Sequence, residues 1–369
     1  MIPFLDLGAA TLELKAKIDA AVARVVDSGW YIGGPEVETF ETEWAAFCGA
    51  KYAVGVGNGL DALHLALRAT GVGPGDEVIV ASNGYIATQL AVTMVGATPV
   101  PVEPDSATHN LDPARIAVAI TPRTKAILPT HLYGQPADLD AIFAVAEGHG
   151  LVLIDDAAQA HGARYKGKNI GGHAASITCW SFYPSKNLGA LGDAGAITTN
   201  DPDLAARVRR LGNYGSEKRY VNQELGVNSR LDPIHAAVLG VKLKKLDQWN
   251  QCRAAIATFY TDALADTGLT LPHVPDWADP AWHLYVVQST DRDRLAARLD
   301  EAGIQTLIHY PIPPHRQAPY AGMGLAEGSL PIAEALAKRV LSLPIGPHLT
   351  MDDAARVADA VNAIYRDRA

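Results

Sequence analysis

Short apolar runs alternate with stretches of helical periodicity along the first two-thirds of the chain. The apolar runs predict strands over 52–56, 77–82, 98–103, 125–130, 151–156, 177–182 and 195–200. Apolar residues at helical spacing predict helices between them, over 60–69, 85–96, 114–120, 139–150 and 201–213. The strands lack apolar–polar alternation, which indicates burial on both faces. This order predicts an α/β fold with a mostly parallel sheet and helices on both faces.

The last third of the chain has a different pattern. Residues 232–265 have helical spacing, and residues 284–289 predict a strand. The proline-rich segment 309–319 predicts a loop without regular structure. A length of 369 residues suggests two units at roughly 100–200 residues per domain. We therefore expect a large domain over residues 1–245 and a smaller C-terminal α+β domain over residues 246–369.

Composition and charge restrict the classes of partner. Hydrophobic residues make up 48% and charged residues 19%, which is ordinary for a globular protein. The net charge of −9 argues against a nucleic-acid partner, which would need a basic face. Three widely separated cysteines suggest a reducing compartment, and we expect a cytoplasmic location. No apolar stretch reaches about 18 residues and the first residues do not resemble a signal peptide, so we expect no membrane association.

A lysine in a glycine-rich loop is the strongest candidate for covalent chemistry. Lys186 follows the strand expected over 177–182 and precedes Gly189, Gly192 and Gly195. Only a neutral amine attacks a carbonyl carbon, and a partly desolvated lysine has the lowered pKa that this requires. Taken alone, however, a lysine in such a loop is more often a solvated surface residue.

Two neighbouring carboxylates give this lysine a context. Asp155 and Asp156 end the strand predicted over 151–156, and ligands of open α/β sheets bind at the carboxyl ends of strands. Successive side chains of a strand point to opposite faces, so only one of the two can meet a ligand. A carboxylate opposite the ring nitrogen of pyridoxal phosphate keeps that nitrogen protonated. A simple strand-end turn and a divalent-metal site are the alternatives.

A third feature is a strand, a glycine-rich turn and a helix. Gly55 near the end of the strand is followed by Gly57, Asn58 and Gly59, and a helix then opens at about Leu60. Backbone N–H groups at a helix start bind phosphate. A dinucleotide fingerprint would require glycine at position 60, where this chain has leucine. A phosphate site and a plain tight turn both remain open.

Together these residues resemble the DegT/StrS family of pyridoxal-phosphate (PLP) dependent sugar aminotransferases over nearly the whole chain. The similarity lies in ordered motifs: YIGGPEVETFE, GNGLDALHLAL, GVGPGDEVIVAS, ITPRTKAILPTHLYGQPADLD, IDDAAQAHGA, SFYPSKNLGALGDAGA, LGNYGS, NSRLDPIHAA and HYPIPPH. The resemblance implies the type I fold of PLP transferases, which is that of aspartate aminotransferase.

The resemblance also implies roles toward the cofactor. Lys186 matches the lysine that holds PLP as a Schiff base, and Asp156 matches the partner of the pyridine nitrogen. Gln159 matches a contact to the ring hydroxyl. Tyr85 occupies the position of the aromatic residue that stacks on the ring.

The phosphate of the cofactor has its own matching positions. The turn Gly59, Leu60 and Asp61 resembles the backbone cradle, and Ser181 supplies a hydroxyl. Asn228 matches an asparagine that reaches the phosphate from the other subunit. The resemblance therefore implies a homodimer with composite active sites.

The implied reaction is an amino transfer in two half-reactions, with the cofactor passing through its pyridoxamine phosphate form. L-Glutamate is the expected donor and a nucleotide-linked keto-deoxysugar the acceptor. The loop around residues 309–317 resembles that of enzymes that aminate carbon 3 of a dTDP-linked 3-keto-6-deoxyhexose. Residues expected to meet the sugar or its diphosphate are Tyr183, Arg219, Tyr220, His309 and His315.

Other functions remain as alternatives. Amination at carbon 4, or of a UDP-linked sugar, is the nearest. A nicotinamide-dependent sugar oxidoreductase would need a tyrosine and a lysine four residues apart, whereas Tyr183 and Lys186 are three apart. A regulatory protein is disfavoured by the acidic charge and the lack of a helix-turn-helix pattern. The histidines His131, His161 and His173 lack metal-ligand spacing, so we expect no metal site.

Overall fold

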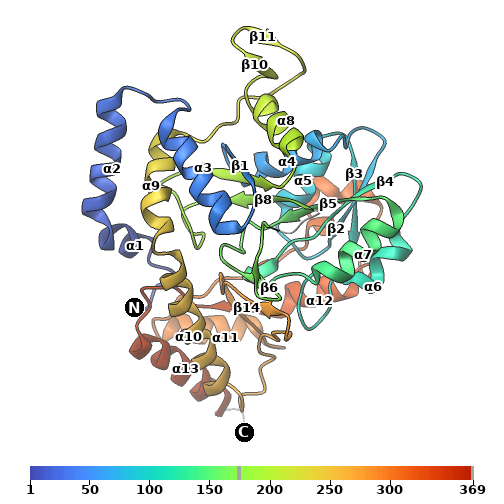
Figure 1. The fold of residues 1–369 in the computed structure, drawn as a ribbon. Helices are drawn as coiled ribbons and strands as arrows, with labels where there is room; N and C mark the ends of the chain where they lie inside the picture. Colours follow the sequence, from blue (N-terminus) through green and yellow to red (C-terminus); the bar gives the residue numbers. More distant parts are fainter. Residues whose placement is uncertain (173–175, 367–369) are drawn as a thin grey trace.

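The computed structural model describes residues 1–172 and 176–366, and at its centre is a seven-stranded sheet (Figure 1). The strands follow the order β1-β9-β8-β5-β4-β2-β3 across the sheet. Their bounds are β1 (Tyr52–Val56), β2 (Glu77–Ala81), β3 (Thr98–Val102), β4 (Thr124–Leu128), β5 (Val152–Asp156), β8 (Ser176–Ser181) and β9 (Gly195–Thr199). Neighbouring strands are parallel except that β9 runs antiparallel to β1 and β8. The α/β fold with a mostly parallel sheet is confirmed.

Helices cover both faces of this sheet. One face carries α4 (Gly59–Ala69), α5 (Ile86–Met94) and α8 (Pro202–Gly212). The other carries α3 (Pro35–Cys48), α6 (Pro113–Ile116), α7 (Leu139–His149) and α9 (Pro233–Leu243). In β2, Val78 and Val80 pack in the first core and Ile79 in the second, because successive strand side chains point to opposite faces. Burial on both faces explains why the strands show no alternation.

Short polar residues fix where several of these helices start. Asn58 caps α4, Asp112 caps α6, Asp138 caps α7 and Asp201 caps α8, each accepting a hydrogen bond from a backbone N–H of the first turn. Asn and Asp are favoured there because they satisfy amides that have no partner within the helix. The cap before α4 directs the start of that helix to the edge of the sheet where β1 ends.

The C-terminal part has a core of its own. Strand β13 (Tyr285–Gln288) pairs antiparallel with β14 (Val340–Leu343), and α10 (Leu246–Ala263), α11 (Arg292–Glu301) and α13 (Met351–Arg366) pack around them. The first residues of the chain join this core: Ile2 is buried in it, and its N–H donates to the carbonyl of Gly303 at 2.7 Å. The division into residues 1–245 and 246–369 remains a prediction.

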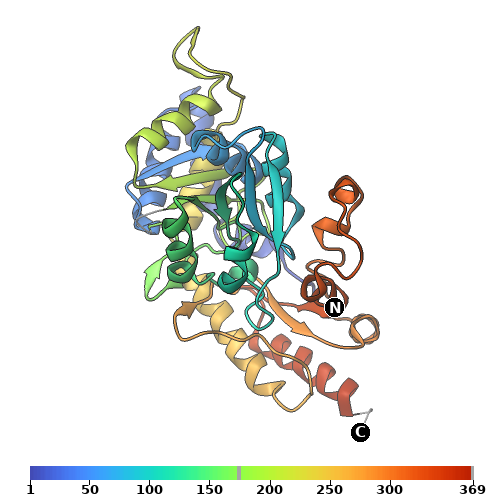
Figure 2. The ribbon, with the colours of Figure 1, turned by 90° about the vertical axis from the view of Figure 1, so that its right-hand side faces the viewer.

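Smaller elements complete the chain. They are α1 (Leu7–Glu13), α2 (Lys15–Ser28), α12 (Pro331–Arg339), β6 (Arg164–Tyr165), β7 (Lys168–Asn169), β10 (Ser216–Lys218), β11 (Val221–Asn222), β12 (Ala278–Asp279) and the 3-10 turns η1 (Ala117–Ala119), η2 (Leu132–Gly134), η3 (Pro314–Arg316) and η4 (Ala318–Met323). The hairpin of β10 and β11 projects from the top of the molecule in both views (Figures 1 and 2). No helix of the described segments is long and apolar enough to cross a membrane.

Two sequence predictions need correction. The helical region predicted over 232–265 is two helices, α9 and α10, with a break at Lys244 and Lys245. Apolar spacing continues through the break because α9 packs on α2 and α3 whereas α10 packs on α13. The segment 309–319 is not wholly irregular, because Pro314 opens a 3-10 turn and the fixed φ of proline suits that first position. His173 lies outside the described residues.

Candidate active site

The carboxyl ends of neighbouring strands bring the candidate residues to one edge of the sheet. Asp156 ends β5 and Ser181 ends β8, the strand beside it. The start of α4 reaches the same place, since a Cβ atom on Gly59 would lie only 2.6 Å from Cβ of Ser181. Residues from three separate sequence motifs therefore meet where open α/β sheets bind their ligands.

The loop after β8 places Lys186 and is held from several sides. The Lys186 N–H donates to the carbonyl of Tyr183 at 2.8 Å. Gly189 passes so close to Pro184 that a Cβ there would lie 2.3 Å from the proline carbonyl oxygen. The buried Asn187 amide donates to the Ala281 carbonyl at 2.7 Å. These contacts fix the backbone on both sides of Lys186.

The electrostatic surroundings of Lys186 suit a nucleophilic amine. Burial lowers the pKa of Lys186 to about 8, although the neighbouring Asp156 carboxylate acts in the opposite direction. Burial also lowers the pKa of His161 to about 3 and that of His309 to about 4, and the Lys186 charge contributes to both shifts. Burial and the Lys186 charge also lower the pKa of His283, so the Lys186 cation acts on three neutral histidines and one carboxylate. A sizeable neutral fraction of Lys186 exists near pH 8.

Asp156 is the carboxylate that faces this lysine. It is buried, and its Oδ2 accepts a hydrogen bond from the Thr88 hydroxyl at 2.7 Å while Oδ1 accepts from the Ala158 N–H at 3.2 Å. Burial raises the pKa of Asp156, and these hydrogen bonds and the Lys186 charge oppose the shift. Asp155 accepts a long hydrogen bond from Thr178 on the adjacent strand. The expectation that only one of the pair faces the site agrees with these contacts.

The start of α4 offers amides for an anion. The Asp61 N–H donates to Oδ1 of its cap Asn58 at 2.8 Å, so this predicted cradle donor is already engaged. The first two amides, of Gly59 and Leu60, point out of the helix end, where they have no acceptor within the helix. The Ser181 hydroxyl lies beside them. This corner has the donors that a phosphate group needs.

One residue of the phosphate corner was missed at the sequence level. The Ser229 hydroxyl accepts from the Gly57 N–H at 2.9 Å and donates to the Asp61 carboxylate at 2.7 Å, which ties the turn to a distant segment. Its neighbour Asn228 is exposed, and its backbone pairs with Asn213. A phosphate contact of Asn228 across a subunit boundary stays a prediction.

Gln159 and Tyr85 are linked through Tyr310, which sequence reasoning missed. Oε1 of Gln159 accepts from the Tyr133 N–H at 2.6 Å, and its Nε2 donates to the Tyr310 hydroxyl at 3.1 Å. The rings of Tyr85 and Tyr310 lie 5.3 Å apart at 37°. The motif HYPIPPH contained the signal, because Tyr310 directly follows the candidate His309.

These residues fit pyridoxal phosphate. The cofactor needs an amine for its aldehyde, a carboxylate for its ring nitrogen and amide donors for its phosphate. Lys186, Asp156 and the Gly59–Leu60 turn beside Ser181 supply these three in one place. Gln159 and Tyr85 lie near each other at this edge, because Gln159 donates a hydrogen bond to Tyr310 and the ring of Tyr85 contacts the ring of Tyr310.

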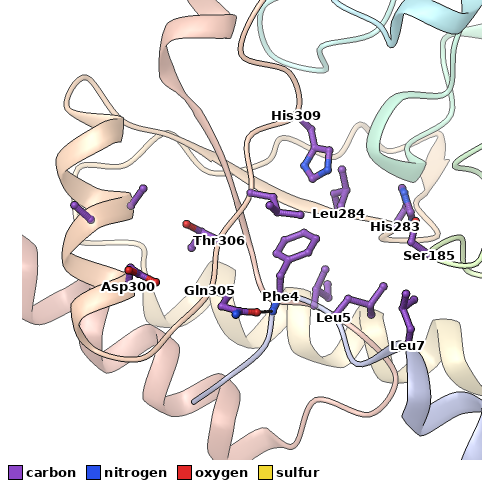
Figure 3. Close-up of a pocket in the computed structure, with 14 residues that line it drawn as sticks. Phe4, Leu5, Leu7, Ser185, His283, Leu284, Asp300, Gln305, Thr306 and His309 are labelled. Carbon is purple, nitrogen blue, oxygen red and sulfur yellow. Dashed lines mark hydrogen bonds between the residues drawn. The ribbon is translucent and has the colours of Figure 1, made fainter.

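A cavity of about 720 Å³ opens beside the lysine loop (Figure 3). Its lining is mainly apolar and comes from the first residues of the chain, the lysine loop, the residues just before β13, α11, segment 305–309 and the segment after β14. The lining residues are Phe4, Leu5, Leu7, Ser185, His283, Leu284, Ala296, Ala297, Asp300, Gln305, Thr306, Leu307, His309 and Ile345. Ser185 precedes the lysine, and His309 stands over Phe4 in the view. The structure thus brings His309 close to Lys186.

The structure does not bring His315 to this cavity. His315 is buried, and its Nε2 lies 3.2 Å from Oε1 of Glu334. The same glutamate accepts the Gly328 N–H at 2.9 Å. These contacts connect the proline-rich segment and Gly328 to Glu334 of α12, which agrees with a structural role for His315.

The remaining predicted sugar contacts are exposed. Tyr183 belongs to the lysine loop and is half exposed. Arg219 and Tyr220 form the tip of the β10–β11 hairpin, where the guanidinium carbon lies 4.9 Å from the centre of the tyrosine ring. The hairpin projects away from the sheet (Figure 1), so within one chain these two residues stand apart from Lys186. Their contact with a nucleotide diphosphate stays a prediction.

The chain is similar to a known protein family and to known proteins over nearly its whole length. The model of the "DegT/DnrJ/EryC1/StrS aminotransferase family" matches residues 12–362. The "Erythromycin biosynthesis sensory transduction protein EryC1" of Saccharopolyspora erythraea is 56% identical over 363 residues, 98% of this chain and 99% of that protein. The "dTDP-3-amino-3,4,6-trideoxy-alpha-D-glucose transaminase" of Streptomyces venezuelae is 56% identical over 361 residues, which are 98% of this chain and 95% of that protein.

A solved structure is similar over nearly the entire length. The crystal structure of S. venezuelae DesV in complex with a ketimine intermediate superposes with a TM-score of 0.98 at 55% identity, covering 99% of this chain and 98% of that one. At this coverage the match extends over almost all of the chain that carries the candidate site.

Proposed function

Because the chain belongs to the DegT/DnrJ/EryC1/StrS aminotransferase family, we propose that it transfers an amino group from L-glutamate to carbon 3 of a dTDP-linked 3-keto-6-deoxyhexose. It is a PLP-dependent aminotransferase of the nucleotide-sugar type. The observation that carries the chemistry is the pair of the partly buried, desolvated Lys186 and the buried Asp156 at the carboxyl edge of the sheet. The assignment of carbon 3 and of dTDP rests on the 56% identical S. venezuelae transaminase, whose name specifies a dTDP-linked 3-amino sugar.

When bound, PLP withdraws electrons from the carbon that loses a proton. The residues of the chain direct that proton. Asp156, held by Thr88 and Ala158, keeps a proton on the ring nitrogen of the cofactor. Nζ of Lys186, with a pKa lowered to about 8, takes the proton from the α carbon of the donor and returns one in the second half-reaction. A base with a pKa near the working pH is the effective choice, and contributes about 10²–10⁴-fold.

The site is proposed to be completed in a homodimer. Asn228, Arg219 and Tyr220 are exposed, and the last two form the tip of a hairpin that projects away from the sheet of their own chain. Large apolar side chains are also exposed, with Leu225 after β11 at 87% and Trp30 between α2 and α3 at 57% exposure. Exposed apolar groups of this size are typical of a surface that a second subunit covers.

The test of the function is direct. Purified protein loaded with PLP is mixed with L-glutamate and then with a panel of dTDP- and UDP-linked 3- and 4-ketosugars, and NMR locates the new amino group. We expect amination only of the dTDP-linked 3-ketosugar. Amination of a 4-ketosugar alone would overturn the assignment of carbon 3, and a protein that binds no PLP would overturn the whole proposal.

A complementation experiment tests the composite site. Lys186→Ala removes the reactive amine, and Asn228→Asp directs a negative charge at the phosphate, so each variant alone should be inactive. If Asn228 acts across the subunit boundary, mixed dimers contain one intact site and recover activity. Mixtures that remain inactive although subunits exchange, as mass spectrometry would show, contradict the composite site.

A further inference from the structure

A buried hydroxyl in the C-terminal part points at the site. Ser342 lies on β14 with no exposed surface, and its backbone N–H and carbonyl pair with Leu307. Its Oγ lies 2.8 Å from Nδ1 of His309. In the two described segments of the chain this Oγ has no other hydrogen-bond partner. A buried hydroxyl proton requires an acceptor, and Nδ1 is the acceptor within reach.

This contact decides which ring nitrogen of His309 carries the proton. A neutral imidazole has one N–H and one bare nitrogen, and the hydrogen bond at one nitrogen selects the tautomer. Since the Ser342 hydroxyl donates to Nδ1, the ring proton is on Nε2. Considering only residues that the structure describes, Nε2 has no hydrogen-bond partner, and the ring lines the cavity beside Ser185.

The ring is also held in position. The centroid of the Phe4 ring lies 5.8 Å from that of His309 with a 34° tilt, and the Tyr310 ring approaches edge-on at 5.5 Å. The Phe4 N–H donates to Oε1 of Gln305, and this hydrogen bond and the rings of Phe4 and His309 are visible in Figure 3. The Tyr133 hydroxyl donates to the backbone carbonyl of His309. The Nε2–H direction is therefore set by packing from several sides.

The surroundings of the Nε2–H indicate whether the acceptor that it binds is charged or neutral. Leu284 and Leu307 line the cavity beside the ring, and burial together with the Lys186 charge lowers the pKa of His309 to about 4. A neutral N–H in apolar surroundings suits an uncharged acceptor such as a hydroxyl or keto oxygen. A carboxylate would instead favour the protonated imidazole, which these surroundings disfavour.

We propose that Ser342 is a positioning residue that fixes the Nε2–H tautomer of His309, and that this N–H binds an uncharged oxygen of the acceptor sugar. The inference rests on the proposed function, because it names the sugar rather than glutamate as the group that His309 meets. Ser342 itself contacts neither substrate.

The first test separates the two half-reactions by stopped-flow absorbance of the cofactor in Ser342→Ala, Ser342→Thr and the unmodified protein. We expect Ser342→Ala to slow the sugar half-reaction about tenfold, the effect of one lost hydrogen bond, and to leave the glutamate half-reaction within twofold. Ser342→Thr keeps the hydroxyl and should restore the sugar rate. An equal slowing of both half-reactions, or no slowing, overturns the proposal.

A double-mutant cycle tests whether Ser342 acts through His309. His309→Gln keeps an N–H near the position of Nε2 without a tautomer to control. Ser342→Ala should therefore have no further effect in the His309→Gln background. An undiminished effect in that background would mean that Ser342 supports the structure in another way.

A third readout does not depend on turnover. Solid-state ¹⁵N NMR of protein labelled in its histidine rings, with His309→Gln to assign the signal, reports the protonation of each nitrogen. We expect a bare Nδ1 in the unmodified protein and a mixture of tautomers in Ser342→Ala. A protonated Nδ1 in the unmodified protein overturns the inference, whereas failure to aminate any ketosugar would overturn the proposed function and leave this measurement valid.

Discussion

The residues that surround Lys186 and the residues that are proposed to meet the sugar lie in two differently built regions. Around Lys186, Asp156 and Ser181 come from adjacent strand ends, and Gly59 packs against Ser181. The sugar side combines His309 from a proline-rich loop, Phe4 from the first residues and Arg219 from an exposed hairpin. The first region is formed within one sheet, whereas the second is assembled from distant and partly exposed segments.

This difference predicts which half-reaction each region affects. Groups near Lys186 take part whenever a proton is moved, so changes there should affect both half-reactions. Groups on the sugar side should affect only the second. Measuring the two half-reactions separately is therefore the way to test whether the two regions are functionally distinct.

The largest expected effect is that of Lys186→Ala. Loss of the amine should slow both half-reactions by at least about 10²–10⁴-fold, since the neighbouring His161 and His309, with pKa values lowered to about 3 and about 4, are weaker bases. Stopped-flow absorbance of the cofactor measures the rates of both half-reactions. Lys51→Ala, a change at an exposed lysine, is the control and should leave both rates unchanged. A variant impaired only with the sugar would contradict the separation of the two regions.

Asp156→Asn should rank second. It removes the buried charge but keeps the shape, and loss of one such electrostatic group lowers rates by about 10²–10³-fold. Both half-reactions should slow by similar factors. Thr88→Val removes only one donor to this carboxylate, so it should show a smaller effect in the same direction.

The rate at which the cofactor attaches to the apoprotein should rise about tenfold between pH 7 and pH 9. The pKa of Lys186 is lowered to about 8, so the reactive neutral amine is scarce below that pH and predominates above it. The rate at which PLP attaches to the apoprotein should rise through pH 8 and level off. Because the Asp156 charge raises this pKa, Asp156→Asn should move the midpoint to lower pH, and a midpoint near 10 would contradict the burial of Lys186.

Arg219→Ala tests the sugar side. If the guanidinium binds the diphosphate, its loss should raise KM for the nucleotide sugar roughly tenfold, as for a hydrogen bond to a charged group. The glutamate half-reaction should not change. The adjacent exposed Lys218→Ala is the matched control, and an equal effect of both variants would indicate general charge attraction only.

The smallest effect on catalysis is expected for His315→Ala. His315 is buried against Glu334 and does not line the cavity, so KM for the sugar should stay unchanged. The free energy of unfolding should fall by about 1–3 kcal/mol, because the buried histidine is lost and the partly buried Glu334 carboxylate loses its partner. Urea unfolding measures this. A raised KM with unchanged stability would place His315 in the sugar pocket after all.

The two regions also differ in how far the sequence predicts them. The meeting of Asp156 and Lys186 follows from buried strands whose carboxyl ends share an edge, together with motifs that resemble a known family. The contact of Ser342 with His309, or of Phe4 with the same ring, joins residues that no local pattern relates. Periodicity likewise missed the break between α9 and α10, because each helix faces a different core and the spacing continues through both.

The pairing of Ile2 with Gly303 has a consequence for synthesis of the chain. Strands β1 to β9 and the lysine loop are complete once residue 199 has been made. Phe4 can take its place in the cavity wall only after segment 303–309 has been made. The backbone of Ile2 and Phe4 forms its hydrogen bonds with Gly303 and Gln305 of that segment. During translation, which proceeds from the N-terminus, the amine-bearing edge can thus form first. The surface proposed to select the sugar closes only when the two ends of the chain meet.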